Sequence, residues 1–129
     1  ADLTQGQSQP FDITVKGRKL HLSKFHNGMA RVGFFDLCGQ ALGPADYLAL
    51  AETLRLLVIE NIPQLGRGNF NEAKRFVTLI DTLYEGKVRL ICSAAARPGM
   101  LYLEGEGSFE FERTASRIME MQSAEWGQV

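Results

Sequence analysis

Two arginines near the end of the chain are the residues whose type and spacing best suit chemistry. Arg113 and Arg117 lie four residues apart in a segment with helical periodicity, so both project from one polar face, one turn apart. Two guanidinium groups placed in this way can reach a shared anion. A plain structural role is equally well supported, because Glu110 and Glu120 lie three residues from them, the spacing of a solvated salt-bridge stripe.

Glu60 is a weaker candidate for a functional residue. It ends an aliphatic run, Leu57-Val58-Ile59, where P-loop enzymes place a carboxylate for magnesium. The phosphate loop Gly-x-x-x-x-Gly-Lys-Ser/Thr is missing from the sequence, and magnesium normally takes substrate phosphates as further ligands. We therefore favour a surface acid at the end of a buried strand. A magnesium-dependent hydrolase using Asp46, Glu60 and Asp81 is the least favoured interpretation, since nothing in a sequence makes these acids converge.

The remaining polar groups indicate structure rather than catalysis. Gly66-Arg67-Gly68 precedes a helix but lacks a following Lys-Ser/Thr, which favours a loop with a helix cap over an anion site. His21 and His26 have no cysteine or acid at metal-ligand spacing, so we expect surface histidines and no metal site. Cys38 and Cys92 lie in apolar segments and are expected to be reduced, buried thiols.

Composition sets the class of protein in which these residues must work. A length of 129 residues with 45% hydrophobic content predicts one domain, residues 1–129, with 1–9 as a linker. Fourteen Lys and Arg against 15 Asp and Glu leave no excess charge for nucleic acid. No apolar run approaches the roughly 18 residues of a membrane span, and the start lacks a signal-peptide pattern. We expect a soluble protein of the bacterial cytoplasm or the mitochondrial matrix.

The first third of the chain predicts a small antiparallel sheet. Apolar and polar residues alternate strictly through Phe11–Leu22, with a turn signal at Lys16-Gly17-Arg18, which is typical of a β-hairpin. His26-Asn27-Gly28 is a second turn signal. A third strand is therefore predicted at Met29–Phe34.

The following segments predict a βαβ unit. After a helix over Pro44–Thr53, with proline in its first turn, the continuous aliphatic run Leu56–Ile59 predicts a strand buried on both faces. An amphipathic helix over Asn71–Tyr84 leads to a second buried strand, Val88–Cys92. Strands joined by such a helix lie parallel with a right-handed crossover.

The last predicted element is an amphipathic helix that begins near Ser108 and ends at Met121. One side is expected to hold Phe111, Ala115, Ile118, Met119 and Gln122. The predicted fold class is α/β: an N-terminal antiparallel hairpin sheet joined to a βαβ unit, with a C-terminal amphipathic helix.

Several uncommon strings occur together and in order. The strings are Phe35-Asp36-Leu37-Cys38, Gly43-Pro44-Ala45-Asp46-Tyr47-Leu48, Ile62-Pro63, Asn71-Glu72-Ala73-Lys74-Arg75-Phe76, Leu79-Ile80-Asp81-Thr82-Leu83-Tyr84, Phe111-Glu112-Arg113-Thr114-Ala115-Ser116-Arg117 and Glu120-Met121-Gln122-Ser123. This ordered set resembles the C-terminal half of the ATPase family that includes ATPase family gene 1 and bacterial ZapE. The resemblance runs from about Val15 to Trp126.

The resemblance implies the C-terminal portion of an AAA+-related ATPase whose Walker and sensor motifs lie upstream. ATP and magnesium would be cofactors of the parent protein, and none is expected in this chain. The implied activity is ATP hydrolysis coupled to protein remodelling or degradation, in cell division or protein quality control. The implied partners are the ATPase core of its own chain, client proteins and further copies of itself. Arg113 and Arg117 then become nucleotide-sensing candidates, and the alternative is an interaction module that recruits a protease or division protein without touching nucleotide.

Overall fold

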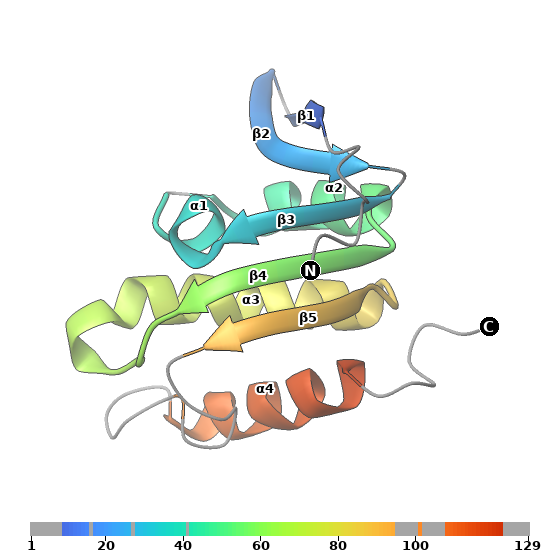
Figure 1. Cartoon of the computed structure of the whole chain (residues 1–129). Coiled ribbons are helices and arrows are strands. Elements are labelled where there is room, and N and C mark those ends of the chain that lie inside the picture. Colours follow the sequence, from blue (N-terminus) through green and yellow to red (C-terminus); the bar gives the residue numbers. More distant parts are fainter. Residues whose placement is uncertain are drawn as a thin grey trace.

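The computed structural model describes residues 9–15, 17–26, 28–40, 42–94, 101 and 108–122. Most of the predicted linker, residues 1–8, lies outside the described residues, but Gln9 already belongs to the first strand. The described residues form one sheet with helices packed on it (Figure 1).

Five strands form a single mixed sheet in the order β1-β2-β3-β4-β5 (Figure 1). The first two neighbouring pairs, β1 with β2 and β2 with β3, are antiparallel, and the other two, β3 with β4 and β4 with β5, are parallel. The fold is therefore α/β with a hairpin joined to a βαβ unit, as predicted. The strands are β1 (Gln9–Val15), β2 (Arg18–His26), β3 (Met29–Gly33), β4 (Leu56–Ile62) and β5 (Arg89–Ala94).

Helices cover one face of this sheet. Figure 1 shows α2 and α3 behind the strands and α4 alongside β5, at the edge of the sheet. None of the helices in the described part of the chain is both long enough and apolar enough to cross a membrane. The helical elements are α1 (Phe34–Cys38), α2 (Pro44–Thr53), the 3-10 turn η1 (Arg67–Asn69), α3 (Phe70–Glu85) and α4 (Ser108–Met121).

The path after β3 differs from the prediction. The strand ends at Gly33, and Phe34 begins the unpredicted helix α1, because the Asp36 carboxylate accepts a hydrogen bond from the Gly33 N–H (2.9 Å) and caps this turn. β3 also pairs in parallel with β4, from Met29 opposite Leu56 onward. The hairpin and the βαβ unit thus share one sheet, and β3, with α1 and α2, forms a second parallel crossover that the sequence analysis missed.

Aromatic rings connect the helices over the covered face. The ring of Phe76 on α3 lies 5.6 Å from that of Phe34 and 6.1 Å from that of Phe111, between ring centroids. The buried Tyr47 hydroxyl donates to the Leu37 carbonyl (2.8 Å), so α2 holds the end of α1. These ring contacts join α1, α3 and α4 into one packed layer.

Helix α4 is amphipathic, but two predicted positions are wrong. Phe111, Ala115 and Ile118 are buried as expected, whereas Met119 is 63% exposed and Gln122, just after the helix, is exposed too. Thr114 and Met121 are buried instead, because they complete the row that faces α3 and β5.

The second face of the sheet is open among the described residues, which corrects the prediction of strands buried on both faces. Along β4, Leu57 and Ile59 are buried under the helices, but the intervening Val58 is only half-buried. On β5, Leu90 is buried and Ile91 is 45% exposed. Alternate residues of each strand therefore point to the uncovered face.

Candidate functional site at the contact of α3 and α4

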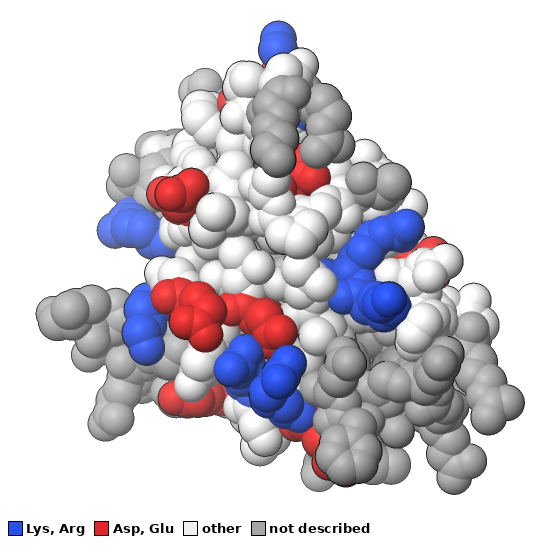
Figure 2. Space-filling model, turned by 180° about the vertical axis from the view of Figure 1, so that it is seen from behind, with Lys and Arg blue, Asp and Glu red and all other residues white. Residues whose placement is uncertain are grey.

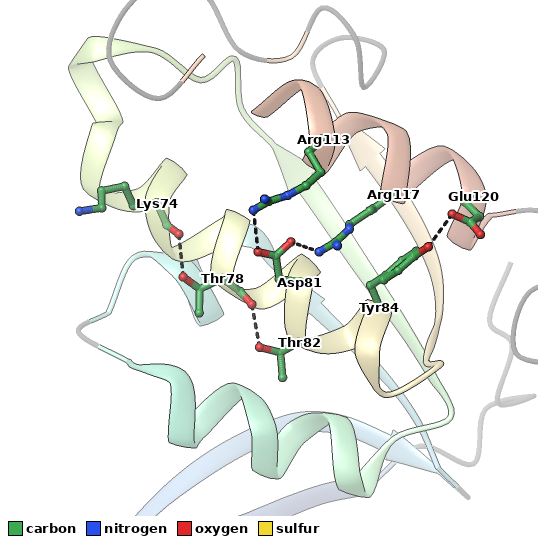
Figure 3. A network of polar contacts seen from close by, with 8 residues as sticks. All are labelled: Lys74, Thr78, Asp81, Thr82, Tyr84, Arg113, Arg117 and Glu120. Carbon is green, nitrogen blue, oxygen red and sulfur yellow. Dashed lines mark hydrogen bonds and ion pairs between the residues drawn. The ribbon is translucent and has the colours of Figure 1, made fainter. Parts of the chain in front are cut away.

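The two arginines sit on α4 where it crosses the polar edge of α3. The buried stripes of the two helices pack together, with Phe76, Leu83, Phe111 and Ile118 among the buried residues. Because these stripes fix the rotation of each helix, Asp81 and Tyr84 of α3 face the arginines of α4 (Figure 3).

Arg117 is held tightly in this contact. Its guanidinium donates to the Asp81 carboxylate at 2.6 Å and its central carbon lies 4.5 Å from the centroid of the Tyr84 ring. The side chain is only 24% exposed. A partly buried arginine that is both paired and stacked is a staple between two helices.

Arg113 is held loosely by the same carboxylate. The distance from its Nη2 atom to Asp81 is 3.4 Å, and 57% of its side chain is exposed. The two arginines therefore do reach a shared anion, and in this structure the anion is Asp81 (Figure 3). Arg113 is the one whose guanidinium remains accessible from outside.

The predicted pair between Arg117 and Glu120 is not formed. Glu120 instead accepts a hydrogen bond from the Tyr84 hydroxyl at 2.9 Å. This bond is the main cause of a raised pKa for Tyr84, because it favours the neutral phenol. The other predicted pair, from Glu110 to Arg113, depends on a side chain outside the described residues.

Glu60 lies at the far end of β4, on the open face of the sheet. It accepts a hydrogen bond from Arg31 on the neighbouring strand at 2.6 Å, and this bond is the main reason why its pKa is lowered. Asp46 accepts a bond from the Gly43 N–H (2.8 Å) at the start of α2. Asp46, Glu60 and Asp81 thus have separate partners, and no cluster able to hold a metal exists among the described residues.

The remaining candidates are structural. Asn69 accepts a hydrogen bond from the Gly66 N–H (2.8 Å), so this glycine segment is a loop with a helix cap, as predicted. Both cysteines are free thiols; Cys38 is buried, and burial raises its pKa to about 12, while Cys92 is half-buried. His21 is exposed and pairs with Asp12 at 2.7 Å.

Sequence reasoning missed Asp81 and Tyr84 as the partners of the arginines. Asp81 was considered only as one of three acids of a hydrolase. The sequence contains one signal for Asp81. It follows the buried Ile80 and so lies at the border of the apolar stripe of α3, the position from which a side chain reaches a neighbouring helix. Which helix that would be was not readable from spacing alone.

Comparison with known proteins places the sequence of this chain in a family. The model of the family described as AFG1-like ATPase matches residues 1–128. The chain belongs to the AFG1-like ATPase family. It is 33% identical to the cell division protein ZapE of Escherichia coli K12 over 114 residues, which cover 88% of this chain and 30% of that protein. It is 30% identical to lactation elevated protein 1 homolog B of Danio rerio over 151 aligned positions, which cover 92% of this chain and 30% of that protein.

The chain of this AFG1-like protein spans about 30% of the length of these two relatives. No solved structure matches it. The family assignment agrees with the ordered strings of the sequence, and it covers α3 and α4, the helices that carry Asp81 and the two arginines.

Proposed function

We propose that this chain is an accessory region of an AFG1-like ATPase, and that the parent protein couples ATP hydrolysis to the remodelling of other proteins. Membership of the AFG1-like ATPase family supports ATP hydrolysis by the parent, and the similarity to the cell division protein ZapE supports a role in cell division. The sequence has no phosphate loop of its own, so nucleotide would be bound by another part of the parent. We place the parent in the bacterial cytoplasm or the mitochondrial matrix.

Within this function, Arg113 is the proposed nucleotide-sensing residue and Arg117 its support. The single observation that carries this division is the difference in exposure, 57% against 24%, around one carboxylate. A sensor must leave its resting partner and reach a phosphate, which a 3.4 Å contact permits. Arg117, stacked on Tyr84 and paired at 2.6 Å, keeps α4 in place on α3.

The test is turnover by the full-length parent. Arg113→Ala should lower ATP hydrolysis by about 10³-fold, because an arginine that stabilises charge on the transferred phosphoryl group has effects of this size. Thermal melts and sedimentation should show unchanged folding and assembly. Arg117→Lys is the matched control, and its turnover should stay near wild type.

If Arg113→Ala turns over ATP within about twofold of wild type, corresponding to about 0.4 kcal/mol in the barrier, Arg113 senses no nucleotide. The α3–α4 contact would then be only a structural staple.

An interaction module without nucleotide contact is the second candidate, and a groove on the helix face favours it. Leu48, 54% exposed, lines a hollow of about 730 Å³ between α2 and α3. The charged residues among its described lining are the acids Glu52, Asp81 and Glu85. Figure 2 shows acidic side chains on this face with Lys and Arg side chains next to them. Such a groove suits a basic, partly apolar client segment. Loss of client binding with unchanged turnover in Leu48→Ser would favour this second function.

A further inference from the structure

The open face of the parallel strands carries apolar residues, with arginines between them, that no described helix covers. Register places Met29, Leu56 and Arg89 side by side across β3, β4 and β5, followed by Arg31, Val58 and Ile91. Parallel sheets are normally covered on both faces, because their strands consist of apolar residues on both sides. The helices α2 and α3 cover one face, and none of the described helices covers the other.

A hollow of about 470 Å³ lies on this open face, where β5 meets the end of α4. Its apolar lining includes Met29, Leu56 and Ile91. Among the described residues that line it, the charged ones are Arg55 and Arg89. The hollow therefore offers an apolar floor beside two guanidinium groups.

The backbone fixes the two arginines at this position. The Arg55 N–H donates to the Gly28 carbonyl (2.7 Å), and the Arg89 N–H donates to the Arg55 carbonyl (2.8 Å). Gly28 has a φ of +84°, and a side chain there would lie 2.9 Å from Nε of Arg55. These backbone hydrogen bonds hold Arg55 and Arg89 next to each other at this edge of the sheet.

The charges of the open face favour an acidic partner. Lys24 pairs with Arg31 across β2 and β3, so it points to the same face as Arg31 and Arg89. Glu60, a described acid on this face, is already hydrogen-bonded to Arg31 at 2.6 Å. Complementary charge would come from carboxylates on whatever covers the face.

We infer that the open face of β3, β4 and β5 is the docking surface for the ATPase core of the same polypeptide. The core presents an apolar ridge to Val58 and Ile91, and a carboxylate to Arg89 in the hollow. This inference rests on the proposed function, because it requires a parent chain that contains such a core.

The core is the favoured occupant for two reasons. A second copy of this face would place its arginines against those of the first, which is unfavourable. A client that binds and leaves would expose the apolar residues of three parallel strands between encounters, and such exposure promotes aggregation. A core on the same polypeptide covers these residues permanently. The two relatives, of which the chain spans about 30%, are long enough to include one.

Thiol labelling tests the inference directly. In a background with Cys38→Ala and Cys92→Ala, Ile91→Cys and Leu48→Cys should react with a maleimide at similar rates in the 129-residue chain, since Ile91 and Leu48 are 45% and 54% exposed. In the full-length parent, Ile91→Cys should react at least about tenfold more slowly, the result of about 1.4 kcal/mol of docking. Leu48→Cys, on the helix face, should not change.

Two charge variants sharpen the test in the full-length parent. Adding Arg89→Glu to Ile91→Cys should restore fast labelling, whereas Arg89→Lys should keep the protection, and melts confirm that each variant is folded. Equal labelling of Ile91→Cys in the short and full-length chains overturns the inference. Protection that grows with protein concentration alongside self-association in sedimentation also overturns it, since the occupant is then a second copy. Labelling needs no ATP turnover, so a failed Arg113 test leaves this result readable.

Discussion

The two faces of the sheet have similar amino acids and different surroundings. Leu57, Ile59 and Leu90 are buried under α2 and α3, while their neighbours Val58 and Ile91 are half-buried or exposed on the open face. A run of aliphatic residues therefore shows that a strand is suited to cover on both faces. It does not show how much of that cover lies in the chain itself. In this protein the covered face supplies stability, and the open face is where we infer the docking of the core.

The largest expected difference between the two faces is in stability. Phe76→Ala should lower the free energy of unfolding by about 3–5 kcal/mol, because it leaves a cavity between two packed rings in a fully buried site. Ile91→Ala on the open face should cost under about 1 kcal/mol. Urea denaturation of the 129-residue chain measures both.

Comparable losses in these two variants would show that the open face is covered within the chain. The comparison of the two faces would then be wrong, and the docking inference with it. Leu57→Ala, at the covered position next to Val58, is a useful second reference for the covered face.

The two arginines of the α3–α4 contact should differ by less. Arg117→Ala should lower the free energy of unfolding by about 1–2 kcal/mol, because it removes a partly buried ion pair and a guanidinium stacked on Tyr84. Arg113→Ala should cost under about 0.5 kcal/mol, as exposed pairs do. Thermal and urea unfolding at low salt give both values.

Arg117→Lys separates the two parts of the Arg117 effect, since lysine keeps the charge but lacks the planar group that lies over the Tyr84 ring. An equal loss in Arg113→Ala and Arg117→Ala would contradict the division into a loose sensor and a tight support.

Local patterns predicted most elements because each depends on nearby residues. The alternation in β1 and β2, the proline that opens α2 and the stripe of α3 each lie within one element, and those elements were found. The end of β2 was predicted too early, since the strand continues past Leu22 to His26. Helix α1 was missed because its five residues are too short for a periodic pattern, and its start depends on Asp36 folding back to Gly33.

Only the α4 side of the candidate site was predicted, for the same reason. Arg113 and Arg117 follow from spacing within α4, but Asp81 lies more than thirty residues away on α3. The packing of the two buried stripes, Phe76 against Phe111 among them, brings the two helices together. Likewise the parallel pairing of β3 with β4 depends on the crossover through α1 and α2, which no local pattern contains.

The smallest expected effect lies on the open face and depends on pH. The Arg31 hydrogen bond lowers the pKa of Glu60 in the folded state, so this group adds stability above its unfolded pKa of about 4.3 and loses that contribution as the pH falls through the lower folded pKa. Both side chains are about one-third exposed, so solvent screening limits the effect to under about 1 kcal/mol. Glu60→Gln should therefore be less stable than wild type at pH 7, and the gap should close on acidification to about pH 3. Urea unfolding of both proteins across this range measures the gap, and subtracting one curve from the other removes the titration of the other carboxylates.

Asp12→Asn, at the exposed pair with His21 on the distant hairpin, is the matched control for a generic surface acid. A gap that stays constant from pH 7 to pH 3 would mean that Glu60 acts through its shape and hydrogen bonding alone. The charge of the Arg31–Glu60 pair would then add nothing to the free energy of unfolding.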